Sequence, residues 1–230
     1  MADRVVFASF YTPDYYHWAQ TLDISLNALG LPSMFLKRAS LGDWSKNIAA
    51  KPRAILELMG MCSGYEYMCF LDADSVVCSY PKLLFAIDAD LAASVWRPSL
   101  QFPPEPTCGT VLLRLCDKTR DVVASWVRRT ERSKSPTRRD QIALRDEIMS
   151  NAGISFVALP PTYNDMSYGW WGDSPVIVGR RCGSLNSYSP KLLELARNEM
   201  DGWKSKRFRG LHIPTDVIRN ALAAGIRPRI

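Results

Sequence analysis

Apolar residues in the first part of the chain alternate between a strand-like run and a helix-like periodicity. Residues 4–10 form a nearly continuous apolar run, which is typical of a buried strand. Over residues 15–29 the apolar side chains recur at three- and four-residue steps, as they do on one face of a helix. Gly30 and Pro32 favour the end of that helix, and residues 33–37 form the next apolar stretch. The chain therefore begins with a predicted strand-helix-strand unit.

The alternation continues along the chain and predicts the fold class. Residues 46–62 are expected to be mostly helical, and residues 67–71 form an uninterrupted apolar run, which is typical of a central strand covered on both faces. Strands that alternate with helices favour an α/β fold with a mostly parallel central sheet flanked by helices on both faces. Four prolines within residues 98–106 predict an irregular connection. The further expected elements are helices at 81–87, 119–132, 138–150, 190–200 and 215–224, and strands at 91–96, 110–116, 154–159 and 175–178.

The length and composition suit one soluble domain. The chain has 230 residues, of which 47% are hydrophobic, and this is enough for a large core. We expect a single domain over residues 1–230, with a nucleotide-binding half over about 1–100 and an acceptor half over about 101–230. No apolar run approaches the length of a membrane span, and the first residues lack a signal-peptide pattern, so a cytoplasmic location is expected, with an anchor removed from the chain as the alternative. The six cysteines are not clustered, which favours free thiols over a zinc site.

Two Asp-x-Asp tripeptides occur, and their positions differ. Asp72 and Asp74 come directly after the apolar run at 67–71. In open parallel sheets, ligands bind outside the carboxyl ends of the strands, so this pair is expected at the edge where chemistry takes place. Asp88 and Asp90 lie between an expected helix and the next strand, which places them toward the opposite edge. We interpret that second pair as a solvated turn with capping roles.

Two carboxylates at the end of a strand have a chemical use. In an extended segment alternate side chains share one side, so Asp72 and Asp74 are expected to point the same way. Hard carboxylate oxygens suit Mg²⁺ or Mn²⁺, which also bind the oxygens of a diphosphate and act as a Lewis acid toward a departing nucleoside diphosphate. The alternative interpretation is a polar strand end that holds no ligand.

Six segments, taken in order, carry a wider similarity. They lie at 7–16, 44–52, 70–77, 108–114, 139–144 and 159–164. Over about residues 4–180 the sequence resembles the GT-A fold glycosyltransferases, in particular the small nucleotide-diphospho-sugar transferase-like proteins with an Asp-x-Asp motif. The resemblance implies a GT-A, Rossmann-like fold and a metal-dependent, hexosyltransferase-like activity. The implied donor is a nucleoside-diphosphate sugar with UDP as the expected nucleotide, and the implied acceptor group is a hydroxyl.

The resemblance also implies roles for the residues of a metal site. Asp74 matches the direct ligand of Mn²⁺ or Mg²⁺, and Asp72 matches a residue that contacts ribose or sugar and shares in holding the metal. Many members supply a third ligand, often a histidine, from a late strand or loop. Here Gly179 follows the late strand, and His212 is the candidate third ligand, with a structural or exposed histidine as the alternative.

The donor contacts follow from the same resemblance. It places Tyr11 and Thr12 near the nucleotide base, and Gly109 and Thr110 beside the donor sugar. Lys51 is a candidate nucleotide contact, and its alternative is a solvated position at the start of a helix.

Asp140 is the candidate catalytic residue. The resemblance gives it two possible roles, a contact to the donor sugar or a general base toward the acceptor, since a carboxylate within reach of a hydroxyl suits that task. A third interpretation is local: residues 136–140 open a helix, and an acidic residue there suits the helix dipole.

The net charge of +6 is relevant to the identity of the acceptor. Basic residues concentrate between Arg128 and Arg139 and between Lys204 and Arg209, and such a surface attracts nucleotides, nucleic acid or acidic glycans. The acceptor is therefore expected to be a glycan or, alternatively, a modified base in DNA whose phosphates meet these clusters. Trp170 and Trp171 are candidates to stack on a base or a sugar. A second alternative is a non-catalytic nucleotide- or nucleic-acid-binding module on a transferase scaffold.

Overall fold

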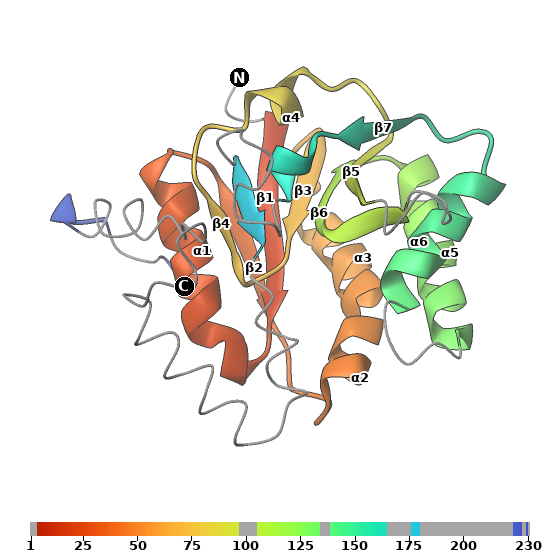
Figure 1. Ribbon diagram of the computed structural model, residues 1–230, viewed down its shortest axis with the longest axis horizontal. Helices are drawn as coiled ribbons and strands as arrows, with labels where there is room; N and C mark the ends of the chain where they lie inside the picture. The colour runs from red at the N-terminus through yellow and green to blue at the C-terminus, as the bar shows by residue number, and fades with distance from the viewer. Residues whose placement is uncertain are drawn as a thin grey trace, which may run out of the picture.

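The computed structural model of the protein describes residues 4–96, 105–133, 139–164, 176–179, 223–226 and 229. These residues form a central six-stranded sheet with helices on both of its faces, and a separate two-stranded sheet lies beside it (Figure 1). This arrangement confirms the predicted α/β class with flanking helices.

The strands of the central sheet are β1 (Val5–Tyr11), β2 (Ser33–Lys37), β3 (Tyr67–Leu71), β5 (Leu91–Trp96), β6 (Glu105–Arg114) and β7 (Phe156–Leu159). Their order across the sheet is β2-β1-β3-β6-β5-β7. β1 pairs in parallel with β2 and β3, and β5 pairs in parallel with β7. β6 pairs antiparallel with both β3 and β5, so it runs against the other five strands. The predicted mostly parallel sheet is confirmed.

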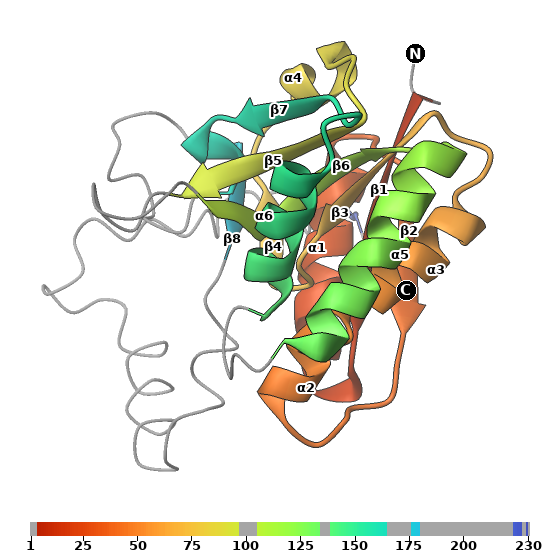
Figure 2. The same cartoon turned by 90° about the vertical axis from the view of Figure 1, so that its right-hand side faces the viewer.

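The larger helices are α1 (Tyr16–Ala28), α3 (Lys51–Met61), α5 (Asp117–Arg132) and α6 (Arg139–Ser150). Helix α1 lies on one face of the central sheet, whereas α3, α5 and α6 lie on the other (Figures 1 and 2). The shorter helices are α2 (Trp44–Ala49), α4 (Lys82–Ala86) and the 3-10 helices η2 (Pro13–Tyr15) and η3 (Pro161–Tyr163).

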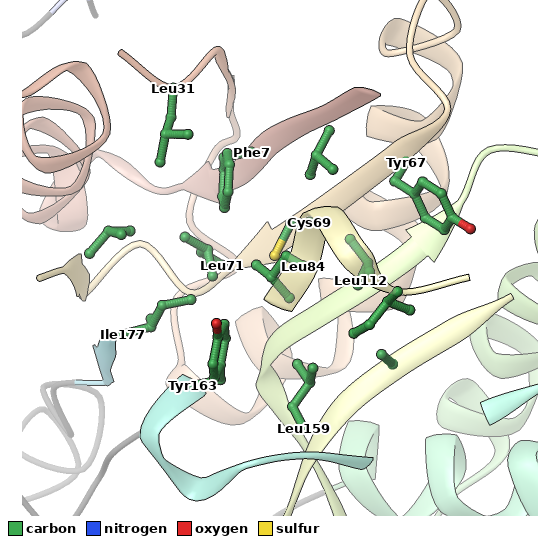
Figure 3. Close-up of a cluster of buried hydrophobic side chains, with 14 of the residues drawn as sticks. Phe7, Leu31, Tyr67, Cys69, Leu71, Leu84, Leu112, Leu159, Tyr163 and Ile177 are labelled. Atoms are coloured by element: carbon green, nitrogen blue, oxygen red, sulfur yellow. The ribbon is translucent and has the colours of Figure 1, made fainter. Parts of the chain in front are cut away.

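Alternation of side chains along the strands divides the core into two layers. On the α1 face, Phe7 and Cys69 pack in one cluster with Ile177, as Figure 3 shows. On the other face, their sequence neighbours Ala8 and Phe70 pack with side chains of α3, α5 and α6. Both faces of β1 and β3 are therefore buried, which explains why these strands are continuous apolar runs in the sequence.

One of the predicted helices is observed as two separate helices. The helix predicted over 46–62 is divided at Ala50 into α2 and α3. Pro52 lies in the first turn of α3, where it has no N–H to continue the hydrogen bonds of α2. A proline is well tolerated in a first helical turn, so the same residue that ends one helix suits the start of the next.

The proline-rich connection ends earlier than predicted. β6 begins at Glu105 and contains Pro106, so the expectation of irregular structure over 98–106 is wrong for these two residues. Pro106 pairs next to a register shift in β5, where the regular ladder is already interrupted. The helices expected at 190–200 and over most of 215–224 lie outside the described residues.

The second sheet pairs β4 (Ser75–Val77) with β8 (Ile177–Gly179) in antiparallel fashion. A strand was expected at 175–178, and β8 is observed close to it, whereas β4 was not predicted. Ser75 pairs with Gly179, so β8 lies against the segment that follows Asp74. Within the ranges that the structure describes, no helix is both long and apolar enough to cross a membrane.

Candidate active site

The segment that contains Asp72 and Asp74 begins where β3 ends. Because β1 and β3 are parallel neighbours, their carboxyl ends lie at the same edge of the sheet. The Asp72 N–H donates to the Gly109 carbonyl of β6 (3.0 Å), and the Ser75 N–H donates to the Asp72 carbonyl (2.9 Å). The first bond continues the pairing of β3 with β6, and the second closes the turn from β3 into β4. The predicted place of this aspartate pair, at the carboxyl end of a buried strand, is confirmed.

Lys51 connects the two acidic residues predicted to act at this edge. Its Nζ lies 2.8 Å from Asp72 Oδ1 and 3.2 Å from Asp140 Oδ2. Lys51 opens α3 and Asp140 lies in the first turn of α6, so two helix starts and the end of β3 converge. The Lys51 and Asp140 side chains are only 9% and 4% exposed, whereas Asp72 is 33% exposed. Lys51 is therefore a buried bridge, and its interpretation as a solvated helix start is wrong.

The electrostatics of this cluster favour a charged lysine. Burial works against the ammonium, but the charges of Asp72 and Asp140 outweigh it and raise the pKa of Lys51 above its ordinary value. Burial raises the pKa of the Asp72 carboxyl, against the lowering influence of Lys51. The neighbouring Cys108 thiol is also buried, and burial together with the Asp140 charge raises its pKa well above the usual range. Cys108 is therefore a neutral thiol and not a nucleophile.

Tyr11 and Thr12 lie at the carboxyl end of β1, at the same edge. The buried Tyr11 side chain belongs to one apolar cluster with Ala73, the residue between the two aspartates. The Thr12 carbonyl accepts a hydrogen bond from the Tyr15 N–H (2.8 Å) at the start of η2. The structure thus brings Tyr11 to the aspartate pair, while the contact of either residue with a nucleotide base stays a prediction.

β6 extends past the end of β3 and forms one wall of the site. Leu71 at the end of β3 pairs with Thr110, so residues 105–109 lie beyond it. Thr110 is fully buried, and its hydroxyl has no hydrogen-bond partner among the described residues. Gly109 is in close contact with Asn164, because a Cβ at this glycine would lie 2.8 Å from Asn164 Oδ1. The predicted contacts of Gly109 and Thr110 with a sugar stay predictions.

Asn164 and Thr107 are two residues of this wall that the sequence did not single out as site residues. Asn164 Nδ2 donates to Thr107 Oγ1 (2.7 Å), and the Thr107 hydroxyl donates to the Ser94 carbonyl (3.2 Å). The signal that could have identified Asn164 is the element at 159–164, which ends on this residue. Its partners Thr107 and Gly109 come from β6, which is distant in sequence, so local pattern does not reveal them.

The described part of the chain supplies two carboxylates for a metal ion at this edge. Asp74 is half-buried directly before β4, and Asp72 is bound to Lys51 through one oxygen. Mg²⁺ and similar ions bind through one or two carboxylates together with substrate phosphates, so this donor set fits such an ion. No group of three metal-ligating side chains occurs within the described residues, and His212 lies outside them. The metal centre and its third ligand stay predictions.

The second aspartate pair lies at the opposite edge of the sheet, as expected, before the start of β5. Asp88 is 81% exposed and pairs with Arg114, but Asp90 is only 12% exposed, so its interpretation as a solvated residue is wrong. Asp90 accepts hydrogen bonds from Lys118 Nζ (2.7 Å) and from the N–H (2.8 Å) and hydroxyl (2.7 Å) of Ser155. Burial alone would raise its pKa, but these bonds outweigh burial and lower the pKa of Asp90 to about 2. Asp90 is a structural anchor.

Part of the first basic cluster is described. Arg128, Arg129 and Arg132 are exposed on the last turns of α5, and residues 134–138 lie outside the described ranges. The second cluster, between Lys204 and Arg209, and the aromatic residues Trp170 and Trp171 also lie outside them.

Comparison with known proteins gives matches in structure. No protein-family model matches the chain, and no curated protein matches it. The structure is similar to a glycosyltransferase involved in the glycosylation of the major capsid of PBCV-1, with a TM-score of 0.61 and 11% identity over 86% of this chain and 99% of that chain. It is also similar to the glycosyltransferase GlyE of Streptococcus pneumoniae TIGR4 in two crystal structures, with TM-scores of 0.57 and 0.56 and identities of 15% and 14%.

The coverage of these matches extends over nearly the whole chain. Each GlyE match covers 98% of this chain but 64% of the GlyE chain, so this chain spans about two thirds of that protein. At these identities the likeness shows a shared fold. The glycosyltransferase fold that the sequence resembles is therefore confirmed.

Proposed function

We propose that this protein is a glycosyltransferase that moves a sugar from a nucleoside-diphosphate sugar to an acceptor hydroxyl. The observation that carries the proposal is the convergence of Lys51, Asp72 and Asp140 at the carboxyl edge of the sheet. Two carboxylates and an ammonium group in one largely buried site suit the hydroxyl groups of a sugar, because charge-assisted hydrogen bonds are stronger than neutral ones. The fold shared with known glycosyltransferase structures supports the same conclusion.

In this proposal Lys51 positions the two carboxylates. Its ammonium contacts both of them and its side chain is almost buried, so a donor meets Asp72 first. Asp72 is the most exposed of the three side chains, and we assign it to the ribose or sugar of the donor. The nucleotide contact expected of Lys51 becomes an indirect one through Asp72.

For Asp140, a position on the donor side of the site is better supported than the role of general base. A general base must lie within hydrogen-bond reach of the acceptor hydroxyl, and this side chain is 4% exposed. Asp140 Oδ2 also lies 3.2 Å from the Lys51 ammonium, so this oxygen already has a partner within the site. We therefore assign Asp140 to the donor side of the reaction, where it holds Lys51 against Asp72.

We further propose that Asp74, together with Asp72, holds Mn²⁺ or Mg²⁺. When bound, such an ion would offset the charge that builds on the departing nucleoside diphosphate. Asp74 is suited to this task because it is half-buried and lies two residues after Asp72, at the same edge as the other site residues. UDP as the nucleotide and a glycan as the acceptor rest on the sequence resemblance.

Nucleotide release tests this proposal. The purified protein is incubated with a panel of UDP-sugars and Mn²⁺, and UDP release is measured with and without excess chelator. We expect release to require the ion and to fall at least about 100-fold in Asp74→Ala, which removes charge stabilisation of the leaving group. Asp88→Ala is the matched control, since it removes the exposed aspartate of the second Asp-x-Asp tripeptide at the opposite edge.

Each outcome of this assay decides one part of the proposal. Full release by Asp74→Ala, or in excess chelator, would exclude the metal role while leaving sugar transfer in place. A folded protein that releases no UDP from any donor would contradict the glycosyltransferase function and favour the non-catalytic binding module.

A further inference from the structure

A surface cavity of about 250 Å³, widely open to solvent, lies between α5 and α6. It is lined by Ser125, Arg128, Arg129, Arg132 and Glu147. The four residues from α5 recur at three- and four-residue steps, which places them on one face of the helix. Figure 2 shows α5 and α6 side by side on the same face of the sheet, and the two helices are in contact.

Positive charge dominates this cavity. The buried Glu147 carboxylate accepts hydrogen bonds from Arg129 Nε (2.6 Å) and from Ser125 Oγ (3.0 Å), so Glu147 and Arg129 neutralise each other. Arg128 and Arg132 are exposed, and neither forms an ion pair with any described residue. Two guanidinium groups therefore remain to bind an anionic group.

The helix dipole explains why arginines lie at the end of α5, but it does not explain the other features of the cavity. Basic residues in the last turns of a helix suit the helix dipole. The dipole, however, requires neither a cavity nor a single-sided arrangement, and it does not require a buried glutamate that holds Arg129 in place. These features make the cavity a candidate site for an anion.

The cavity lies close to the candidate active site. Glu147 follows Asp140 by two helical turns, which corresponds to about 10 Å along α6. Trp126 of α5 donates from Nε1 to the Asp140 carbonyl (2.8 Å), and Arg53, two residues after Lys51, pairs with Glu131 of α5. The basic end of α5 is thus tied to the starts of both α3 and α6, where the Lys51 bridge is located.

We propose that this cavity binds a phosphate group carried by the acceptor. Guanidinium groups bind phosphate oxygens through pairs of parallel hydrogen bonds, and two arginines one turn apart match one phosphate. The rise of about 10 Å along α6 between Asp140 and Glu147 suits an acceptor whose phosphate lies a sugar's length or two from its reacting hydroxyl. This inference rests on the proposed function, because it assigns the acceptor of that reaction.

The charges favour a single phosphate over a nucleic acid backbone. A nucleic acid contact requires a stripe of basic residues that follows successive phosphates. Here Glu131 interrupts the basic residues of α5, and Arg128 and Arg132 are the arginines of this cavity without an acidic partner among the described residues. The described surface therefore provides one compact anion site.

Arginine-selective NMR tests the site directly. The protein is labelled with ¹⁵N-arginine, and inorganic phosphate is titrated in the presence of a chelator while the Nε–Hε signals are recorded. We expect the signals of Arg128, Arg129 and Arg132 to shift together and to saturate. In Arg128→Gln/Arg132→Gln, phosphate should bind at least about tenfold more weakly at Arg129, because the two unpaired guanidinium groups are gone. Arg120→Gln, an exposed arginine at the other end of α5, is the matched control and should not change binding.

Three results would overturn the inference. The first is a linear, non-saturating shift that the Arg120 signal shares, since this indicates charge screening alone. The second is unchanged phosphate binding in the double variant. The third is tight, salt-sensitive binding of single-stranded DNA that the double variant abolishes, since this indicates a nucleic acid partner. UDP release without acceptor, measured on the wild-type protein, reports on the proposed function separately.

Discussion

Replacing Lys51 by methionine removes the charge that joins the two carboxylates of the site. The ammonium lies 2.8 Å from Asp72 Oδ1 and 3.2 Å from Asp140 Oδ2, and its side chain is 9% exposed. Methionine has a similar length and apolar stem but no charge. Lys51→Met therefore leaves Asp72 and Asp140 close together without a counter-ion.

The expected loss of stability follows from this burial. Breaking a buried ion pair by removing one partner costs about 3–5 kcal/mol. We take the lower end, about 3 kcal/mol, because the Asp72 side chain is 33% exposed and water screens part of its charge. In a chain of this size each kcal/mol changes the Tm by about 2–4 °C, so the Tm should decrease by roughly 6–12 °C at pH 7.

The loss should become smaller as the pH falls. In the variant the two carboxylates repel each other, which raises their pKa in the folded state above the unfolded value. A raised pKa favours the folded variant below the unfolded pKa and destabilises it as the pH rises through the folded pKa. The difference in Tm between wild type and variant should therefore be largest at pH 7 and decrease toward pH 4.

Thermal unfolding followed by circular dichroism at pH 7 and pH 4 measures this difference. Lys46→Met is the control, since that lysine belongs to α2 and is 66% exposed, and its Tm should change little. An equal decrease at both pH values would show that lost packing, and not lost charge, accounts for the effect. An unchanged Tm of Lys51→Met at pH 7 would refute the reasoning.

Three further predictions concern the surroundings of the site and the fold. Gly109→Ala should destabilise the protein by about 1–3 kcal/mol, because the new Cβ would lie 2.8 Å from Asn164 Oδ1. The same substitution should cost less in an Asn164→Ala background, and urea unfolding of the four proteins of this double-mutant cycle measures both effects; additive effects would contradict the contact. The pKa of Asp90 is lowered to about 2, so the carboxylate stabilises the fold above about pH 4 and this contribution is lost as the pH falls toward 2. Asp90→Asn should be about 2 kcal/mol less stable than wild type at pH 7, and in urea titrations it should lack this loss of stability in acid. Arg229→Ala should cost about 2 kcal/mol in urea unfolding, because it leaves the fully buried Asp23 carboxylate without its cation although Ser33 still donates to it. An unchanged midpoint would show that this pair does not hold the fold.

The sequence predicts most reliably the strands that are buried on both faces. The strand predicted at 67–71 has the same bounds as β3, because a continuous apolar run is stable only where both faces of the strand are buried. The place of Asp72 and Asp74 follows from the end of that strand and from the rule that ligands bind at carboxyl ends of parallel strands. These inferences use local pattern alone, and the structure confirms them.

Pairings between distant segments could not be predicted in this way. Lys51 has the local pattern of a solvated helix start, and nothing near it in sequence indicates that α6 brings Asp140 against its ammonium. Asp90 has the pattern of a surface turn, yet Ser155 of a distant segment buries it and binds its carboxylate. Asn164 contacts Gly109 because η3 places it over the wall of the site. In each case the tertiary arrangement of the elements, and not the local sequence, determines the role of the residue.

The central claim, transfer of a sugar from a nucleoside diphosphate, is tested most directly by following the donor itself. UDP-hexoses labelled with ¹³C at the anomeric carbon are incubated with the protein and Mn²⁺, and the anomeric signal is recorded over time. We predict that the signal of at least one donor disappears and is replaced by that of a free or transferred sugar, with Asp88→Ala behaving as wild type and Asp74→Ala leaving the donor intact. Equal loss of the donor with Asp74→Ala would exclude the metal role of that residue, and no loss with any UDP-hexose and the folded wild-type protein would contradict sugar transfer itself.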